Sequence, residues 1–328
     1  MNLSQRARLA VPHGVLSVPA VCVAAGLAVA FGVAGVQAPA AEAKRVEVGV
    51  YQDDPARTVP VLRRAAGPRA TAVISAYVTG GRTVPPAVIA LQKRTKARLL
   101  VTWMPDGGKD GARQPKHRLT AIVRGRQDKG LRALARQIGR LRPAPILRPM
   151  PEANTPWYAW SGAANGNTPA QYVAAWKRVR KVVKRSGGRR VLMMWAPYAR
   201  SVPATPENAI PAYFPGLSQV DVVGTSAYNF GDTGGLAWTE PDALFEDAYR
   251  QISALAPKPF WIAETGSTAK GGSREKWLGQ LANLGTSIPN LAGVVWFDVR
   301  DANGDFRVSA SKRSRGAFKA FAARVRTP

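Results

Sequence analysis

The chain is poor in the side chains that carry many kinds of enzyme chemistry, because its 328 residues include one cysteine and two histidines. Cys22 and His13 both lie in the first 43 residues, so the rest of the chain holds a single histidine, His117, in a polar and basic stretch. A thiol nucleophile, a disulfide framework, a Ser-His-Asp triad and a His/Cys zinc site are therefore disfavoured. No glycine-rich phosphate loop is present either. We expect no metal and no organic cofactor, which leaves carboxylates as the candidate catalytic groups.

Acidic residues are also scarce. Lys and Arg number 47 against 20 Asp and Glu, which gives a formal net charge of +27. Such a charge favours an acidic partner, for example an anionic wall polymer, although a solvated arginine-rich surface explains it equally simply. The basic residues are spread along the chain without interleaved aromatic motifs, so no specific nucleic-acid partner is expected.

Residues 1–43 have the composition of an export segment. Two arginines precede an apolar stretch over residues 11–36, and small residues follow up to Ala43. We predict a signal peptide over 1–43 and a mature single domain over 44–328 that is secreted, with association at the cell surface as the alternative. The apolar stretch is also long enough for an uncleaved anchor, the one case in which a membrane is a partner.

Eight short apolar runs rich in β-branched residues follow, and most are continuously hydrophobic, as in parallel strands that are buried on both faces. They lie at 46–51, 72–77, 98–103, 145–148, 190–195, 220–226, 260–263 and 293–297. Helical periodicity separates them, most clearly at 128–141 and at 169–184, where Thr168 and Pro169 provide a capping hydroxyl and a proline at the first helical position. This alternation predicts an α/β fold, a (β/α)8 TIM barrel, with a doubly wound open sheet as the alternative.

Two glutamates follow strands of this predicted barrel: Glu152 comes after the fourth run and Glu264 after the seventh. Side chains at the carboxyl ends of barrel strands converge on one face. A pair of carboxylates that meets there can hydrolyse a glycosidic bond, one as the acid and the other attacking or stabilising the sugar cation. The simpler interpretation is that each glutamate caps a helix or lies on the surface.

Aromatic residues gather near the same predicted strand ends. Aromatic faces stack on the apolar faces of sugar rings, so the set predicts a carbohydrate cleft, even if about half of such residues pack in the core. The predicted substrate-binding residues are Trp103, Trp157, Trp160, Trp195, Tyr228 and Trp296. Arg148 joins them, either as a contact to a carboxylate or sugar or as part of a structural salt bridge. Asp298 is interpreted either as a substrate contact or as a loop cap.

Several segments, in order, resemble glycoside hydrolase family 26, the β-mannanases and their relatives. The segments that carry the resemblance are Ile146-Leu147-Arg148-Pro149-Met150-Pro151-Glu152-Ala153-Asn154 with Trp157 and Trp160, Trp195-Ala196-Pro197, Val220-Asp221-Val222-Val223-Gly224 with Tyr228-Asn229, and Pro259-Phe260-Trp261-Ile262-Ala263-Glu264-Thr265-Gly266. The resemblance covers roughly residues 46–300.

The resemblance implies a retaining mechanism in which Glu264 is the nucleophile, Glu152 is the acid/base and Tyr228 hydrogen-bonds Glu264. One position departs from the family pattern: the family usually has a histidine directly before its acid/base glutamate, and this chain has Pro151.

These observations together predict an exported endo-acting hydrolase of a β-linked polysaccharide, with mannan as the first candidate substrate and β-glucan or β-xylan next. Pro151 motivates one alternative, a catalytically impaired barrel that binds carbohydrate. Another alternative is a hydrolase of the cell's own envelope polymer.

Overall fold

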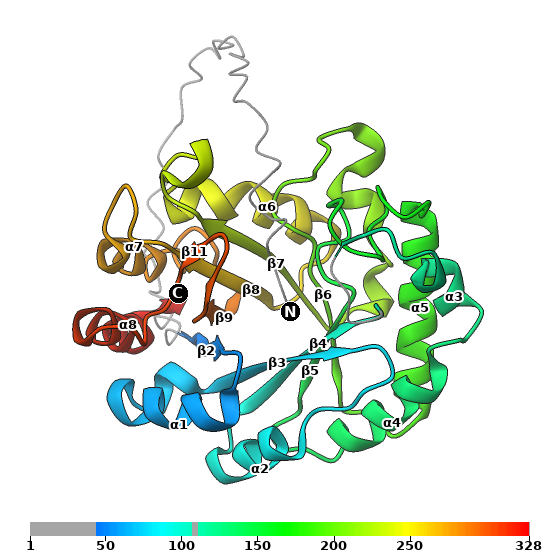
Figure 1. The fold of residues 1–328 in the computed structure, drawn as a ribbon, viewed down its shortest axis with the longest axis horizontal. Helices are drawn as coiled ribbons and strands as arrows, with labels where there is room; N and C mark the ends of the chain where they lie inside the picture. Colours follow the sequence, from blue (N-terminus) through cyan, green and yellow to red (C-terminus); the bar gives the residue numbers. More distant parts are fainter. Residues whose placement is uncertain (1–43, 107–110, 328) are drawn as a thin grey trace, which may run out of the picture.

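The computed structural model describes residues 44–106 and 111–327, and its centre is a closed barrel of eight parallel strands (Figure 1). The predicted export segment lies outside the described residues. The barrel strands are β2 (Glu47–Tyr51), β3 (Val73–Thr79), β4 (Arg98–Met104), β5 (Ile146–Pro149), β6 (Leu192–Trp195), β7 (Val222–Asn229), β8 (Phe260–Ser267) and β9 (Leu291–Phe297). Each strand pairs with the next, and β2 pairs with β9 to close the ring. All eight predicted strands and the predicted barrel are confirmed.

Helices surround the barrel, as Figure 1 shows. They are α1 (Pro55–Ala66), α2 (Pro86–Thr95), α3 (Leu119–Val123), α4 (Asp128–Ile138), α5 (Pro169–Arg185), α6 (Pro241–Leu255), α7 (Arg274–Leu281) and α8 (Lys312–Arg324). The connection from β6 to β7 contains short 3-10 turns in place of an α-helix. In the described part of the chain, no helix combines the length and the apolar character needed to cross a membrane.

The start of α5 shows how local sequence sets these boundaries. The Thr168 hydroxyl accepts a hydrogen bond from the backbone N–H of Gln171, and the Gln171 side chain accepts one from the backbone N–H of Thr168. Pro169 occupies the first helical position, where its missing N–H leaves no intrahelical bond unmade. The predicted helix start at this Thr-Pro pair is confirmed.

Side chains alternate along each barrel strand between the barrel interior and the surrounding helices. One buried apolar cluster fills the part of the interior nearer the amino-terminal ends of the strands. Its members include Leu100 from β4, Ile146 from β5 and Val222 from β7. Two or four residues further along the same strands, the inward positions are polar, namely Thr102, Arg148 and Ser226. The interior therefore changes from apolar to polar toward the carboxyl ends of the strands.

The same alternation corrects three of the predicted substrate-binding residues. Trp103, Trp195 and Trp296 stand next to inward-facing neighbours on their strands, so their own side chains face the helices and are fully buried. Trp296, for example, packs edge-on against Trp277 of α7 and near Phe318 of α8. A sugar cannot stack on an indole enclosed between barrel and helices, so the prediction was wrong for these three residues.

The two ends of the described chain meet on the face of the barrel opposite the carboxyl ends of the strands. Strand β1 (Lys44–Arg45) directly precedes β2 and pairs antiparallel with β12 (Arg326–Thr327), which follows α8. The close approach of Arg326 to Gly285, in the connection that leads into the start of β9, places this pairing at the amino-terminal face.

Candidate active site

Glu264 lies at a bulge in β8. In the register between β7 and β8, Thr225 is opposite Ile262 and Ser226 is opposite Glu264, so Ala263 is an extra residue on β8. Ala263 belongs to the interior cluster, and the Glu264 side chain also reaches the interior, where it binds residues of β3, β5 and β7. A bulge can re-aim a side chain in this way. Without the extra residue, alternation would turn Glu264 toward the helices.

Three donors hold the Glu264 carboxylate. The Tyr228 hydroxyl donates to Oε1, while the Tyr77 hydroxyl and the Arg148 guanidinium both donate to Oε2. An ion pair with arginine and two phenol donors favour the ionised carboxylate. The contact from Tyr228 to Glu264, which the family resemblance implied, is present.

Arg148 is the hub of this network and is fully buried in the barrel interior. Its Nε donates to Thr102 Oγ1 at 3.0 Å, one terminal nitrogen donates to Ser226 Oγ at 3.2 Å, and the other donates to Tyr77 and Glu264. Burial lowers the pKa of Arg148, but the charges of Glu264, Tyr77 and Glu152 outweigh burial and raise it overall. Arg148 therefore remains cationic within electrostatic reach of both glutamates.

Glu152 follows β5 in a turn with an unusual backbone. Met150 and Glu152, on either side of Pro151, have φ values of +50° and +56°, in the left-handed region that side chains rarely adopt. Hydrogen bonds fix the turn: the Glu152 N–H donates to the Ala196 carbonyl at 3.0 Å, and the Trp160 indole donates to the Pro151 carbonyl at 2.8 Å. Strained backbone conformations that surrounding contacts hold in place occur often at functional sites.

The Glu152 side chain is enclosed beside Trp157, whose indole Nε1 donates to Oε2 at 3.2 Å. Trp157 in turn packs edge-on against Tyr198, with ring centroids 5.4 Å apart. Glu264 has Arg148 as a cationic hydrogen-bond partner and two phenol donors, and Glu152 is enclosed beside an indole donor and within electrostatic reach of Arg148. Carboxyls in different surroundings can differ in protonation, which acid-assisted chemistry requires.

Both glutamates are almost completely covered, with 0% of Glu152 and 1% of Glu264 exposed. An aromatic cluster that includes Tyr228, Phe297 and Phe306 packs around the end of β7 beside Glu264. Tyr51, Tyr77 and Tyr198 are only partly buried, so they provide the aromatic surface nearest the two glutamates that solvent reaches. These tyrosines have the chemistry for stacking on sugars that was predicted for the tryptophans.

The structure thus brings together Glu264, Tyr228 and Arg148 in one network, with Glu152 and Trp157 beside it. Trp160 is fully buried, stacks on Tyr158 with ring centroids 4.4 Å apart and supports the turn through its bond to Pro151. Its contact with substrate stays a prediction. In the described ranges, no group of three or more His, Cys, Asp or Glu residues is arranged to hold a metal ion.

Sequence reasoning missed three residues of this network, namely Tyr77, Thr102 and Ser226. Tyr77 is the one that contacts Glu264. It is the last residue of the second predicted strand run, so its place at the carboxyl end of a barrel strand was a usable signal. Tyr51 ends the first run in the same way, and its ring lies 4.4 Å from that of Tyr77.

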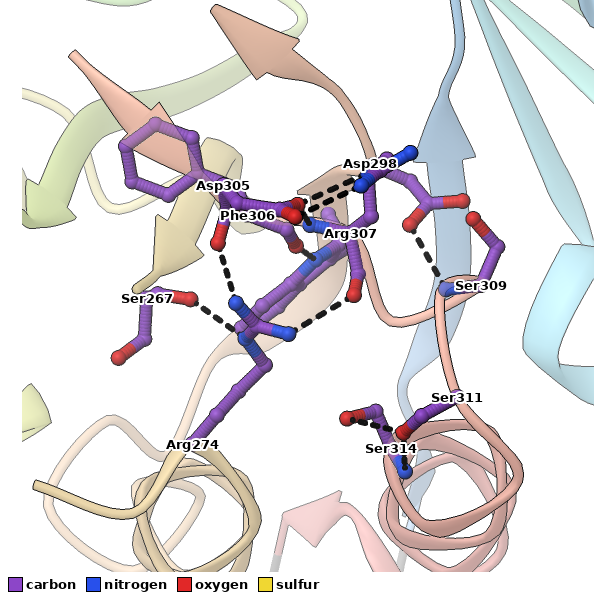
Figure 2. A network of polar contacts seen from close by, with 10 residues as sticks. Ser267, Arg274, Asp298, Asp305, Phe306, Arg307, Ser309, Ser311 and Ser314 are labelled. Atoms are coloured by element: carbon purple, nitrogen blue, oxygen red, sulfur yellow. Dashed lines mark hydrogen bonds and ion pairs between the residues drawn. The ribbon is translucent and has the colours of Figure 1, made fainter. Parts of the chain in front are cut away.

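Beside the site, Arg274 ties two loops together, as Figure 2 shows. Its guanidinium donates to the backbone carbonyls of Ser267, Asp305 and Arg307. The clamp joins the end of β8 to the segment that carries Phe306, and the Phe306 ring packs 5.4 Å from that of Tyr228. Arg274 thus supports the tyrosine that contacts Glu264.

Asp298 caps a loop. Its Oδ1 accepts the backbone N–H of Ser309 at 3.0 Å, a bond visible in Figure 2, and its Oδ2 accepts the side-chain amide of Gln52 at 2.5 Å. Burial raises the pKa of the Asp298 carboxyl above its ordinary value, and the bonds from Ser309 and Gln52 offset only part of that effect.

Asp298→Asn should remove a pH-dependent part of the stability. Because the folded state raises the pKa of Asp298, the stabilisation from its protonated form is present below the unfolded pKa and is lost as pH rises through the folded pKa. Rotation of the Gln52 amide would let its oxygen accept from the amide that the substitution introduces. At about pH 7 we expect the free energy of unfolding of the variant to equal or exceed that of wild type. At about pH 3 we expect it to be lower than that of wild type. Urea unfolding across this range measures the difference, and a constant difference contradicts the argument.

Comparison with known proteins finds similarity to glycosidases. Residues 125–275 match the model of glycosyl hydrolase family 26. Endoglucanase H of Acetivibrio thermocellus is 26% identical over 226 residues, which are 67% of this chain and 24% of that protein. The chain therefore spans about a quarter of the length of this curated relative.

Solved structures share the fold. A family 26 β-mannanase from Bacteroides ovatus superposes with a TM-score of 0.61 and 18% identity, covering 85% of this chain and 88% of the other. A family 26 protein from Muricauda sp. gives a TM-score of 0.62 and 16% identity, covering 85% and 86%.

Proposed function

Since residues 125–275 match the model of glycosyl hydrolase family 26, we propose that the chain hydrolyses a β-linked polysaccharide with retention of anomeric configuration, using Glu264 as the nucleophile and Glu152 as the acid/base. The observation that carries this proposal is the placement of both carboxyls around Arg148 in the barrel interior. Glu264 is ion-paired with Arg148 and accepts from two phenols, and Glu152 lies within electrostatic reach of Arg148 and accepts from an indole.

In the proposed first step, a carboxylate oxygen of Glu264 bonds to the anomeric carbon while the bond to the leaving oxygen breaks and the proton of Glu152 passes to that oxygen. In the second step, Glu152 takes a proton from water as the water oxygen displaces Glu264 from the sugar. Arg148, Tyr77 and Tyr228 orient Glu264 throughout, because each donates to one of its oxygens.

We propose β-1,4-mannan as the first candidate substrate, with β-glucan and β-xylan next. The solved β-mannanase with this fold supports mannan, and the curated relative named as an endoglucanase supports glucan. We also propose that the protein is exported, on the composition of residues 1–43.

A specific observation favours a second candidate function, a barrel that binds carbohydrate without cleaving it. Both carboxyls are covered, and Pro151 replaces the histidine expected before Glu152.

A substrate panel separates the two functions. Purified protein is incubated with mannan, β-glucan, β-xylan and the cell's own envelope polysaccharide, and released reducing ends and bound polymer are both measured. NMR of fresh product reports the anomer formed first: the β-anomer supports retention, the α-anomer contradicts it, and binding without release supports the second function.

Glu152→Gln should lower kcat on the cleaved polysaccharide by about 10²- to 10⁴-fold, because the leaving oxygen then departs without a proton donor. An aryl glycoside with an acidic phenol as leaving group needs little protonation, so its first step should be much less affected. Asp247→Asn, on the exposed side of α6, is the matched control and should leave both rates unchanged. Equal losses on both substrates would instead indicate a structural role for Glu152.

A further inference from the structure

Residues 79–82 at the end of β3 and Asp106 after β4 line an open cavity of about 580 Å³ together with the first turn of α4. Its lining includes Arg82, Asp106, His117, Arg126, Lys129 and Gly130. The cavity lies at the carboxyl ends of the barrel strands, on the same face as the candidate active site. It is outside the network around Glu264 and Glu152.

Cationic side chains dominate the lining. Arg82, Arg126 and Lys129 border the cavity and are exposed, whereas Asp106 is the one carboxylate among the lining residues. Within the described residues, no ion pair to a carboxylate is found for these three cations, although Arg132 and Arg178 nearby both pair with Asp128. An excess of positive charge around a concave site attracts anionic groups.

Close backbone packing builds the cavity wall. A Cβ placed on Gly130 would lie 2.5 Å from the Cα of Gly81, so only glycine lets the first turn of α4 approach the β3 loop this closely. Gly80, with φ of +52°, donates its N–H to the Met104 carbonyl at 2.8 Å and ties the same loop to the end of β4. These contacts hold the loop after β3 against the first turn of α4 and the end of β4.

The cavity is close to the candidate active site along β3. Thr79 lines the cavity, and Tyr77, two residues earlier on the same strand, contacts Glu264. Two residues of a strand span roughly 7 Å, which is comparable to about one or two sugar units. A polysaccharide that lies across the barrel mouth at Tyr77 can therefore place a neighbouring unit over the cavity.

We propose that this cavity is a subsite for an acidic group, a uronate carboxylate or a sulfate ester, carried by the polysaccharide that occupies the barrel mouth. Arginine presents paired N–H donors that match both groups, and lysine adds a point charge. The net charge of +27 draws a polyanionic chain toward the protein. That the protein cleaves this acidic polymer rests on the proposed function. That the cavity binds the polymer does not depend on the proposed function.

The test measures equilibrium binding of three hexasaccharides at about 50 mM NaCl: β-1,4-glucuronan, 6-O-sulfated cellohexaose and neutral mannohexaose. Full-length Glu264→Gln protein is used so that no probe is cleaved. At least one acidic hexamer should bind about tenfold or more tightly than mannohexaose, since charge-assisted hydrogen bonds contribute this much. The ratio between the two acidic hexamers identifies the preferred group.

The combined variant Arg82→Ala/Arg126→Ala/Lys129→Ala should lose that preference by about tenfold while its mannohexaose affinity changes less than about twofold. The matched control is Arg64→Ala/Lys93→Ala/Arg94→Ala, which removes the same charge from exposed positions on α1 and α2, outside the cavity lining. Equal affinity of the parent protein for acidic and neutral hexamers overturns the proposal, and so does an equal loss in the control. Hydrolysis by wild type is scored separately, so the subsite can stand if hydrolysis fails.

Discussion

Glu264→Gln should lower kcat on the cleaved polysaccharide by at least about 10³-fold, because the amide cannot form the covalent bond to the sugar that the proposed mechanism requires. Glutamine keeps the size of the side chain and one oxygen, which can still accept from the Arg148 guanidinium. The loss should therefore appear in kcat, with carbohydrate binding retained.

Single-turnover and steady-state assays measure this loss, with Asp247→Asn as the control that changes an exposed carboxyl of α6 in the same way. Circular dichroism at the assay temperature checks that the variant is folded. If folded Glu264→Gln retains more than about a tenth of the wild-type rate, then Glu264 is not the nucleophile.

Arg148→Met should destabilise the fold by about 3–5 kcal/mol, because it leaves Glu264 as a buried charge without its cationic partner. The guanidinium also serves Thr102, Ser226 and Tyr77, so all of these side chains lose a donor. Urea unfolding at neutral pH gives the free energy.

The matched control is Arg132→Met. Arg132 is also ion-paired, with Asp128, but 52% of its side chain is exposed, and such pairs contribute at most about 1 kcal/mol. The double variant Arg148→Met/Glu264→Gln should regain part of the lost stability, since no unpaired charge then remains in the barrel. A loss below about 1 kcal/mol in Arg148→Met would contradict the view that the pair is held in a low-dielectric interior.

The barrel could be predicted from the sequence because its strands are buried on both faces and read as apolar runs. Those runs located all eight strands to within two residues at all but two ends. The exceptions are instructive: the real β7 and β8 extend further, to Asn229 and Ser267, through polar residues that include Tyr228 and Glu264. An apolar pattern ends where the polar part of the interior begins, although the strand continues.

The direction of side chains was harder to predict than their position along the chain. Trp103, Trp195 and Trp296 are at strand ends, as expected, but each is one residue out of phase with the interior. A shift of one residue exchanges the two faces of a strand, and an apolar run that is buried on both sides contains no sign of the phase. Sequence alone therefore could not separate these residues from Tyr77, which faces inward.

Glu264 illustrates the opposite case. Its position was found by its motif, but strict alternation from Trp261 and Ala263 would have pointed it away from the site. The extra residue at the bulge reverses this direction, and nothing in the run of residues 260–267 signals it. Similarly, the left-handed conformations of Met150 and Glu152 depend on partners such as Ala196, more than 40 residues away.

The pairing of β1 with β12 places both ends of the described chain on the face opposite the barrel mouth. An affinity tag, a surface linker or a fused module joined at the carboxyl end would therefore leave the mouth and the cationic cavity open to solution. Protein immobilised through its carboxyl terminus on a biosensor chip should thus capture long polysaccharide chains as well as free protein does. For the same reason, a support attached at the carboxyl end would hold the barrel with its mouth facing away from the support, so that an insoluble polymer could still reach the mouth.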